Sequence, residues 1–227
     1  MGGLLPGMPE KLNFKKETTD FSEKQRVFSE YFPDGKIESV TIADVPEEVL
    51  HFFEFKSGQF LSPNDYTLGN FEDFFRVRHC DGKETFLAQQ TKTYPQGFLE
   101  AGDTERLTYF VDVDGDKIIG RSELRLNTKC PEEYLEYFKD KPFIGWIETH
   151  EDLWKQGLGT RRMYLMNAYS RMLYGLPLYS DTVNSPRMES LWETLVKKGK
   201  AGKFKEVEYN RFNVLGKGKR DRYVLLA

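Results

Sequence analysis

The stretch from residue 143 to residue 175 constrains the fold most, because a strand, a glycine-containing loop and a helix follow one another directly. Phe143 to Ile147 is short, apolar and aromatic, which is typical of a buried strand. Downstream, apolar side chains recur at steps of three and four residues, as an amphipathic helix requires: Leu158, Met163, Leu165, Met166, Tyr169, Met172 and Leu173. The sequence therefore predicts a strand-loop-helix unit.

Gly157 and Gly159 stand where this loop enters the helix. Glycine removes the side chain and lets the backbone approach a ligand closely. The first N–H groups of a helix have no intrahelical acceptor, and such a site binds anions, most often phosphate groups. Neither a P-loop nor a dinucleotide fingerprint is present, because no Lys-Ser or Lys-Thr pair follows Gly159 and no third glycine completes the pattern. A tight strand-to-helix turn without a ligand remains an equally good interpretation of these two glycines alone.

The segment Trp154-Lys155-Gln156-Gly157-Leu158-Gly159 resembles motif A of the GNAT superfamily of acyl-CoA-dependent N-acyltransferases, which is written Q/R-x-x-G-x-G/A. Both glycines match this motif, whereas Trp154 stands where the family has Gln or Arg. The resemblance implies that backbone amides of the loop bind the pyrophosphate of coenzyme A. The cofactor contacts that it implies are Ile147, Thr149, Lys155, Gln156, Gly157, Leu158, Gly159, Thr160 and Trp192.

Composition and charge exclude several other classes of protein. The chain has 227 residues, of which 39% are hydrophobic and 15% aromatic, so a sizeable core is expected. The net charge of −3 calls for neither nucleic acid nor acidic lipid. Basic residues crowd the segment from Lys197 to Arg222, which predicts a solvated face or, as the minority alternative, a phosphate or nucleic-acid partner.

Cys80 and Cys130 are the two cysteines, and the three histidines lack ligand spacing, so we expect neither a disulfide nor a metal site. No signal peptide and no apolar run of about 20 residues is present, so we expect a cytoplasmic protein without a membrane partner.

The remaining elements are predicted from periodicity and from turn residues. Helices are expected over 22–31, from 43–46 onward, over 64–77 with Phe71, Phe74 and Phe75, over 131–139, and after the N-cap Ser185. Strands are expected over 36–42, 84–93, 107–113, 117–126, 178–183, 204–215 and 223–226, with a hairpin turn at Asp114-Gly115-Asp116.

The GNAT resemblance covers about residues 107–227, and it implies an α/β (α+β) fold. Its mixed central sheet would carry a splayed pair of parallel strands and be flanked by helices. Residues 101–227 would form the acyl-CoA-binding core, and residues 1–100 would form an N-terminal extension on the acceptor side. A single continuous domain is the alternative.

Four polar residues are candidates for catalysis. Glu148 and His150 lie two positions apart at the end of the central strand, so they share one face and are candidates for the general base. Alternatively, Glu148 is a salt-bridged surface acid and His150 is a loop residue without a role in catalysis. Asp181 and Ser185 form a second polar pair, which also fits a turn acid and a helix N-cap.

Trp192 stands seven positions after Ser185, where the family commonly has a Tyr that protonates the departing thiolate. An indole N–H does not act as a general acid near neutral pH, so Trp192 also fits a core aromatic. Thiolate is a tolerable leaving group on its own. A strand N–H near Ile147 to Thr149 would bind the oxyanion by analogy with the family.

The resemblance thus implies an N-acyltransferase that moves an acetyl or other acyl group from acyl-CoA to an amine by direct attack in a ternary complex. The acceptor amine would belong to a small molecule, a protein or a nucleobase. The alternative is a catalytically degenerate GNAT-fold module that binds acyl-CoA, a protein or a nucleic acid without turnover.

Overall fold

The computed structural model describes residues 20–58, 71–93, 104–129, 141–153, 156–180, 185–209 and 218–226. In chain order the elements are α1 (Phe21–Tyr31), β1 (Gly35–Val40), the 3-10 turn η1 (Ile42–Asp44), α2 (Glu47–Gly58), β2 (Phe71–His79), β3 (Glu84–Thr93), β4 (Thr104–Asp114), β5 (Lys117–Lys129), β6 (Phe143–Thr149), the 3-10 turn η4 (Glu151–Leu153), α4 (Leu158–Tyr174), α5 (Pro186–Lys197), β7 (Ala201–Tyr209) and β8 (Gly218–Leu225).

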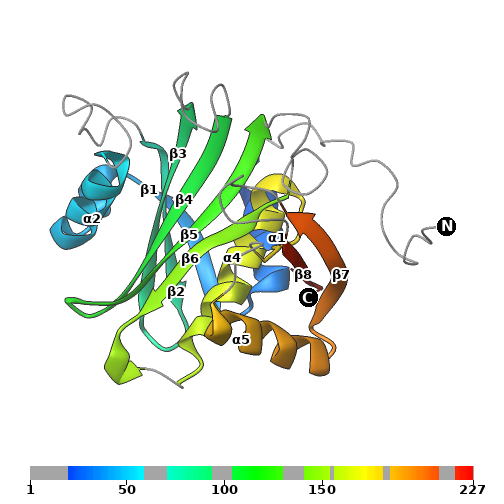
Figure 1. Ribbon diagram of the computed structural model, residues 1–227. Coiled ribbons are helices and arrows are strands. Elements are labelled where there is room, and N and C mark those ends of the chain that lie inside the picture. The colour runs from blue at the N-terminus through cyan, green and yellow to red at the C-terminus, as the bar shows by residue number, and fades with distance from the viewer. Residues whose placement is uncertain are drawn as a thin grey trace.

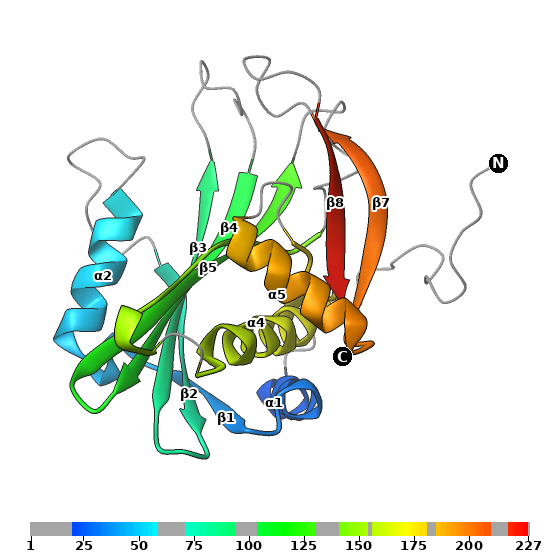
Figure 2. The same cartoon turned by 60° about the horizontal axis from the view of Figure 1, so that its bottom comes forward.

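The central sheet contains six strands, β1 to β6, in the order of the chain, and every neighbouring pair is antiparallel. Helices α1 and α4 cover one face of this sheet and α2 covers the other (Figures 1 and 2). The predicted α+β class, with a central sheet flanked by helices, is therefore confirmed. Residue 100, the expected domain boundary, lies outside the described residues, and the strands on either side of it, β3 and β4, pair with each other.

The strands are apolar on both faces because each face has its own core. On the α4 side, Phe75, Leu87 and Phe110 pack with Met163 and Tyr169 of α4. On the α2 side, Val49 and Phe53 of α2 pack with a second set from the strands: Phe71, Phe86, Leu107, Tyr109 and Val111. Residues on both faces of β3 and β4 thus reach a core, so buried and exposed side chains do not alternate over residues 85–90 and 107–111.

The predicted helix over residues 64–77 is wrong, because the chain from Phe71 to His79 forms β2 and residues 59–70 lie outside the description. Phe71 and Phe74 are three residues apart, as on a helix, yet they meet on the α2 side of a strand. The register with β3 shifts between Phe71 and Asp73, so one extra residue lies between them. Because of this bulge, Phe71 and Phe74 lie on the same face of the strand although they are three residues apart. The same spacing is typical of one face of a helix.

The hairpin at Asp114 is confirmed, with Asp114 opposite Lys117 and Gly115 at a positive φ of 59°. The final antiparallel pair is confirmed as β7 and β8. Tyr179 forms one parallel bridge with Phe143 of β6 and one antiparallel bridge with Val224 of β8. Residues 181–184 and the predicted helix over 131–139 lie outside the described residues, so the splayed parallel pair stays a prediction. No helix in the described ranges is long and apolar enough to cross a bilayer.

Candidate functional site

The N-terminus of α4 carries the features that the sequence predicts for an anion site. Gly157 is its N-cap residue, in the left-handed conformation with φ of 81°, which favours glycine. Among the described residues no side chain caps this end, and the first turn contains no acidic residue. The N–H groups of Leu158, Gly159 and Thr160 precede the first intrahelical bond, which Arg161 donates to the Gly157 carbonyl at 3.0 Å. These three N–H groups are therefore available to an acceptor outside the helix.

Gly159 is unexplained by contacts within the protein. Apart from its chain neighbours and the backbone of α4, no heavy atom of the described residues lies within 4 Å of a Cβ built on Gly159, and its backbone is not in the left-handed region. Glycine in a helix costs about 1 kcal/mol relative to alanine. Because neither packing nor conformation requires glycine here, the open space in front of Gly159 is the structural reason that remains, and it is space that a ligand can use.

A cleft of about 660 Å³ opens beside this helix end. Gly157, Thr160, Arg161 and Tyr164 form its α4 wall, and the opposite walls come from the end of α1 and from the turn between β2 and β3: Tyr31, Phe32, Pro33, Asp34, Cys80 and Asp81. This volume lies within the range of ligand pockets for small molecules and cofactors. The predicted cofactor residues Gly157 and Thr160 thus line a cleft that is large enough for a ligand.

Arg161 joins α4 to the turn between β2 and β3. Its guanidinium donates to both carboxylate oxygens of Asp81, at 2.7 Å and 3.0 Å. Hydrogen bonds from Arg161 and from Lys83 hold the pKa of Asp81 well below its usual range. The negative charge of Asp81, at the edge of the cleft, is therefore compensated by its neighbours.

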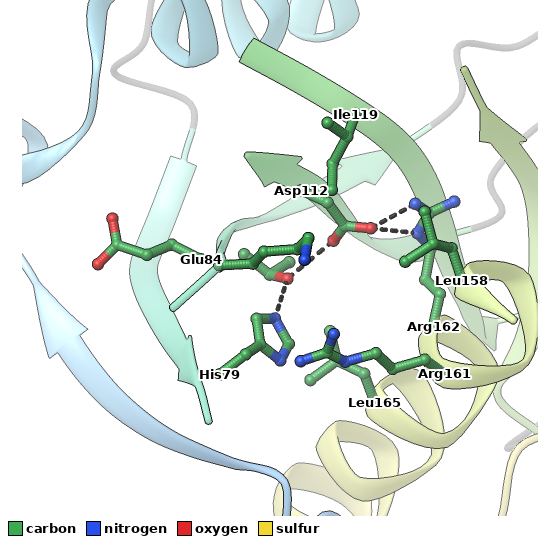
Figure 3. Close-up of a pocket in the computed structure, with 10 residues that line it drawn as sticks. His79, Glu84, Asp112, Ile119, Leu158, Arg161, Arg162 and Leu165 are labelled. Atoms are coloured by element: carbon green, nitrogen blue, oxygen red, sulfur yellow. Dashed lines mark hydrogen bonds and ion pairs between the residues drawn. The ribbon is translucent and has the colours of Figure 1, made fainter. Parts of the chain in front are cut away.

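Arg162, the next residue of α4, is a buried hub that connects three elements, and Figure 3 shows its contact with Asp112 of β4. Its Nε donates to the carboxylate of Asp112 at the end of β4, at 2.7 Å, and its Nη2 donates to the same oxygen. Its Nη1 donates to the backbone carbonyl of Glu148 at 2.7 Å and to the hydroxyl of Thr149 at 3.2 Å. The first turn of α4 is thus fixed to the end of β6, the strand that precedes it.

Gly120 of β5 makes room for this hub. A Cβ at Gly120 would overlap Nη2 of Arg162, would lie 2.8 Å from Cζ, and would lie 3.0 Å from the carbonyl oxygen of Glu148. Sequence reasoning missed Gly120, Asp112 and Arg162. A glycine inside a strand and an arginine on the apolar face of a helix are signals for such a contact, because each is unfavourable at its position without a partner.

The hydrogen-bond network continues from Asp112 into the sheet. Thr85 donates to the second carboxylate oxygen of Asp112 at 2.8 Å, and Nε2 of His79 lies 2.7 Å from the Thr85 hydroxyl (Figure 3). Burial, together with the nearby charge of Arg161, lowers the pKa of His79 to about 4. A cavity of about 20 Å³, enough for one water molecule, is lined in part by His79 and Arg162.

The end of β6 presents backbone groups on the side away from β5. The N–H of His150 donates to Ile119 of β5, so by alternation the N–H of Ile147 points to the outer edge of the strand. Segment 176–180 pairs with β6 only near its start, where Ile144 donates to Tyr179 at 3.2 Å. A register shift between β5 and β6 makes Gly145 the extra residue of a bulge, which bends the strand at this point.

The structure places the predicted catalytic residues in different environments. Glu148 is exposed on the α2 side of the sheet, opposite Arg121 in register. His150 is also exposed, and its Nδ1 lies 3.5 Å from Asp152. Ser185 is the N-cap of α5 and accepts from the Met188 N–H at 3.3 Å, which confirms the predicted cap. Asp181 lies outside the described residues.

The predicted cofactor residues do not all lie at one site. Gly157, Leu158, Gly159 and Thr160 lie together at the start of α4, and exposed Gln156 precedes them. Trp192 lies apart, fully buried and stacked on Tyr223 with ring centroids 5.6 Å apart. A fully buried ring offers no surface to a ligand, so its burial opposes a cofactor contact. Lys155 lies outside the described residues. No group of three His, Cys, Asp or Glu side chains in the described part of the chain is placed to hold a metal ion.

The chain matches no protein-family profile and no curated protein. Among solved structures, a protein from Desulfovibrio desulfuricans that is described as a candidate acetyltransferase of the GNAT family is similar. The likeness covers 85% of this chain and 99% of that protein, with 12% sequence identity and a TM-score of 0.40. A TM-score of this size does not establish a shared fold, so the function proposed below rests on the residues of the chain itself.

Proposed function

We propose that this protein is an acyl-CoA-dependent N-acyltransferase that binds the pyrophosphate of acyl-CoA at the N-terminus of α4. The observation that carries the proposal is the helix end at Gly157, which has no side-chain cap among the described residues and borders the 660 Å³ cleft. A pyrophosphate needs several N–H donors and close backbone approach. Leu158, Gly159 and Thr160 supply the donors, and the missing side chain of Gly159 supplies the approach.

The outer edge of β6 is the second part of the proposed site. Ile147, whose N–H points away from β5, lies one 3-10 turn before the helix end along the chain, and the proposal is that one extended ligand contacts both. Backbone groups at this edge would orient the acyl arm and hold the carbonyl oxygen during transfer. Arg162 fixes the edge relative to α4, because it donates to the Glu148 carbonyl and belongs to the first turns of that helix.

When bound, acyl-CoA supplies a thioester carbon that forms a C–N bond to a neutral amine while its C–S bond breaks, giving an amide and a thiolate that takes up one proton. The attacking amine must lose one proton in this step, and Glu148 is the proposed general base that takes up this proton. Its side chain is exposed at the end of β6, and its backbone is held by Arg162. His150, two residues further, is the alternative base.

One observation favours a second candidate function, a module that binds acyl-CoA without turnover. Trp192 stands where a proton donor is expected, and its Nε1 is buried without a hydrogen-bond partner in the described structure. If the protein does catalyse transfer, the thiolate must leave without help from Trp192. The pKa of a thiol, near ambient pH, permits this. Release of free coenzyme A from acetyl-CoA in the presence of amines distinguishes transfer from simple binding.

The variant Glu148→Gln tests the chemical step. We expect turnover to fall about 100-fold while acetyl-CoA affinity stays within about twofold, because the amide keeps the shape but accepts no proton. Glu151→Gln, an exposed acid three residues further, is the matched control and should keep full turnover. Full activity of Glu148→Gln across the pH range would transfer the proposed role to His150.

A further inference from the structure

A cluster of charged and aromatic side chains lies on the α2 side of the sheet, beside the proposed base. We call it the α2-side patch, and it consists of Phe52, Lys56, Arg121, Trp146 and Glu148. Trp146 and Glu148 are alternate residues of β6, and Trp146 packs in the α2-side core, so Glu148 points to the same side. On the other face of β6, Thr149 contacts Arg162 of α4. The end of β6 is therefore in contact with Arg162 on the α4 side and exposes Glu148 on the α2 side.

Arg121 is placed to recognise part of that acceptor. It lies directly opposite Glu148 in the register of β5 and β6, and its guanidinium carbon lies 4.8 Å from the centre of the Phe52 ring. The cation–π contact holds the guanidinium over the ring, and its N–H groups can still donate to an anion. Arg121 is half-buried, and no carboxylate of the described residues lies within 4.0 Å of it, including that of Glu148.

The surrounding charges favour an anion at this place. Lys56 lies 4.7 Å over the Trp146 ring, so a second cation faces the patch. Glu123, the nearest carboxylate along β5 on this side, is buried and paired with Arg125. A half-buried guanidinium that is preorganised, beside another cation and without a paired carboxylate, is suited to a carboxylate ligand.

We propose that the acceptor is an amine that also carries a carboxylate group, with the carboxylate bound by Arg121 and the amine directed to Glu148. This inference rests on the proposed function, because it assigns the acceptor of that same site. The two side chains have opposite charges and face each other across two paired strands, so they match the two charged ends of an amino acid. The patch thus selects small amino acids or their derivatives over neutral or purely cationic amines.

The experiment compares matched pairs of amines with and without the carboxylate: alanine with ethylamine, and phenylalanine with phenethylamine. Binding to the protein loaded with coenzyme A is measured by calorimetry, and coenzyme A release from acetyl-CoA is measured in parallel. We expect the carboxylate-bearing member of each pair to bind and to react at least about tenfold better, as a charge-assisted pair of hydrogen bonds allows.

The variant Arg121→Met removes the charge and keeps an unbranched stem against Phe52. It should remove the preference for the carboxylate and leave the neutral amine unchanged. Arg121→Lys should retain part of the preference, because it keeps the charge without the planar fork. Arg78→Met, at an exposed side chain of β2 that pairs with Glu38, is the matched control and should keep the full preference.

The outcomes separate this inference from the proposed function. Transfer without a carboxylate preference, or a preference that survives in Arg121→Met, would overturn the inference and leave the acyltransferase intact. Binding through Arg121 without coenzyme A release would support the amino-acid site and contradict transfer. If neither member of any pair binds or reacts, the inference is wrong, and acyl-CoA binding alone then decides the proposed function.

Discussion

The guanidinium of Arg162 donates a 2.7 Å hydrogen bond to the backbone carbonyl of Glu148, which ties the start of α4 to the end of β6. The same guanidinium is paired with Asp112, so the two ends of the proposed cofactor site share one buried ion pair. The end of β6 and the start of α4 are therefore held in fixed positions relative to each other. Backbone groups held in this way lose little conformational freedom when a ligand binds.

Removing the charge of Asp112 tests this role. The variant Asp112→Asn leaves Arg162, which is 1% exposed, as a buried cation without its counter-charge. We expect the free energy of unfolding to fall by about 3 kcal/mol or more, as for other buried ion pairs that lose one partner. Asp81→Asn, at the more exposed pair with Arg161, should cost less than about 1 kcal/mol. Urea unfolding of the two variants and the parent measures both values.

Adding one methyl group at Gly120 should disturb the same hub. In Gly120→Ala the new Cβ overlaps Nη2 of Arg162, so the guanidinium must leave its present position. We expect a loss of about 3 kcal/mol in stability, together with weaker acetyl-CoA binding. Gly202→Ala, whose Cβ would lie 3.3 Å from Val224, should cost less than about 1 kcal/mol and leave binding unchanged. Equal stability of the two variants would argue against the packing described for Gly120.

At Gly159 we expect effects of opposite sign on stability and on binding. Gly159→Ala should stabilise the free protein by a few tenths to about 1 kcal/mol, because alanine is the better helix former and its Cβ meets no protein atom. The same Cβ should weaken acetyl-CoA binding, because it enters the space of the ligand. Gly175→Ala, at the left-handed C-cap with φ of 68°, should instead lower stability and leave binding intact. Melting temperatures with and without acetyl-CoA check both signs.

The buried His79 predicts a dependence of stability on pH. Its pKa of about 4 in the folded protein lies below the value of about 6.5 in the unfolded chain, so between these values only the unfolded chain binds the proton. The contribution of neutral His79 to the free energy of unfolding is therefore complete above about pH 6.5. It is lost as the pH falls toward 4, and the loss is at most about 3 kcal/mol.

The variant His79→Gln should flatten this dependence between pH 7 and pH 4.5, whereas His51→Gln, at an exposed histidine, should not change it. Denaturant unfolding at a series of pH values is the measurement. A parent protein whose stability is constant over this range would contradict the burial of a neutral His79.

The sequence predicts the elements around the site well because local signals define them. Gly157 and Gly175 bound α4 through left-handed backbone conformations, and Ser185 caps α5 through its side chain. These features depend on a few neighbouring residues, so they are visible in the chain itself. The hairpin at Gly115 is predictable for the same reason.

Long-range contacts account for what the sequence does not predict. The Arg162 hub joins residues up to 50 positions apart, and no local pattern indicates that Asp112 is its partner. For the residues from Phe71 onward the sequence wrongly predicts a helix, because a bulge gives the phenylalanines of this strand helical spacing. The patch at Arg121 depends on the register of β5 and β6, which a hydrophobic pattern does not define when both faces of a strand are buried.

The central claim is that the N-terminus of α4 binds acyl-CoA, and calorimetric titration with acetyl-CoA of the parent protein and of Gly159→Leu tests it most directly. The account predicts saturable binding by the parent protein and at least about a tenfold loss of affinity in Gly159→Leu, or about 1.4 kcal/mol, with Gly175→Ala matching the parent. Equal affinity of the parent and Gly159→Leu, or no binding by the parent, would contradict it.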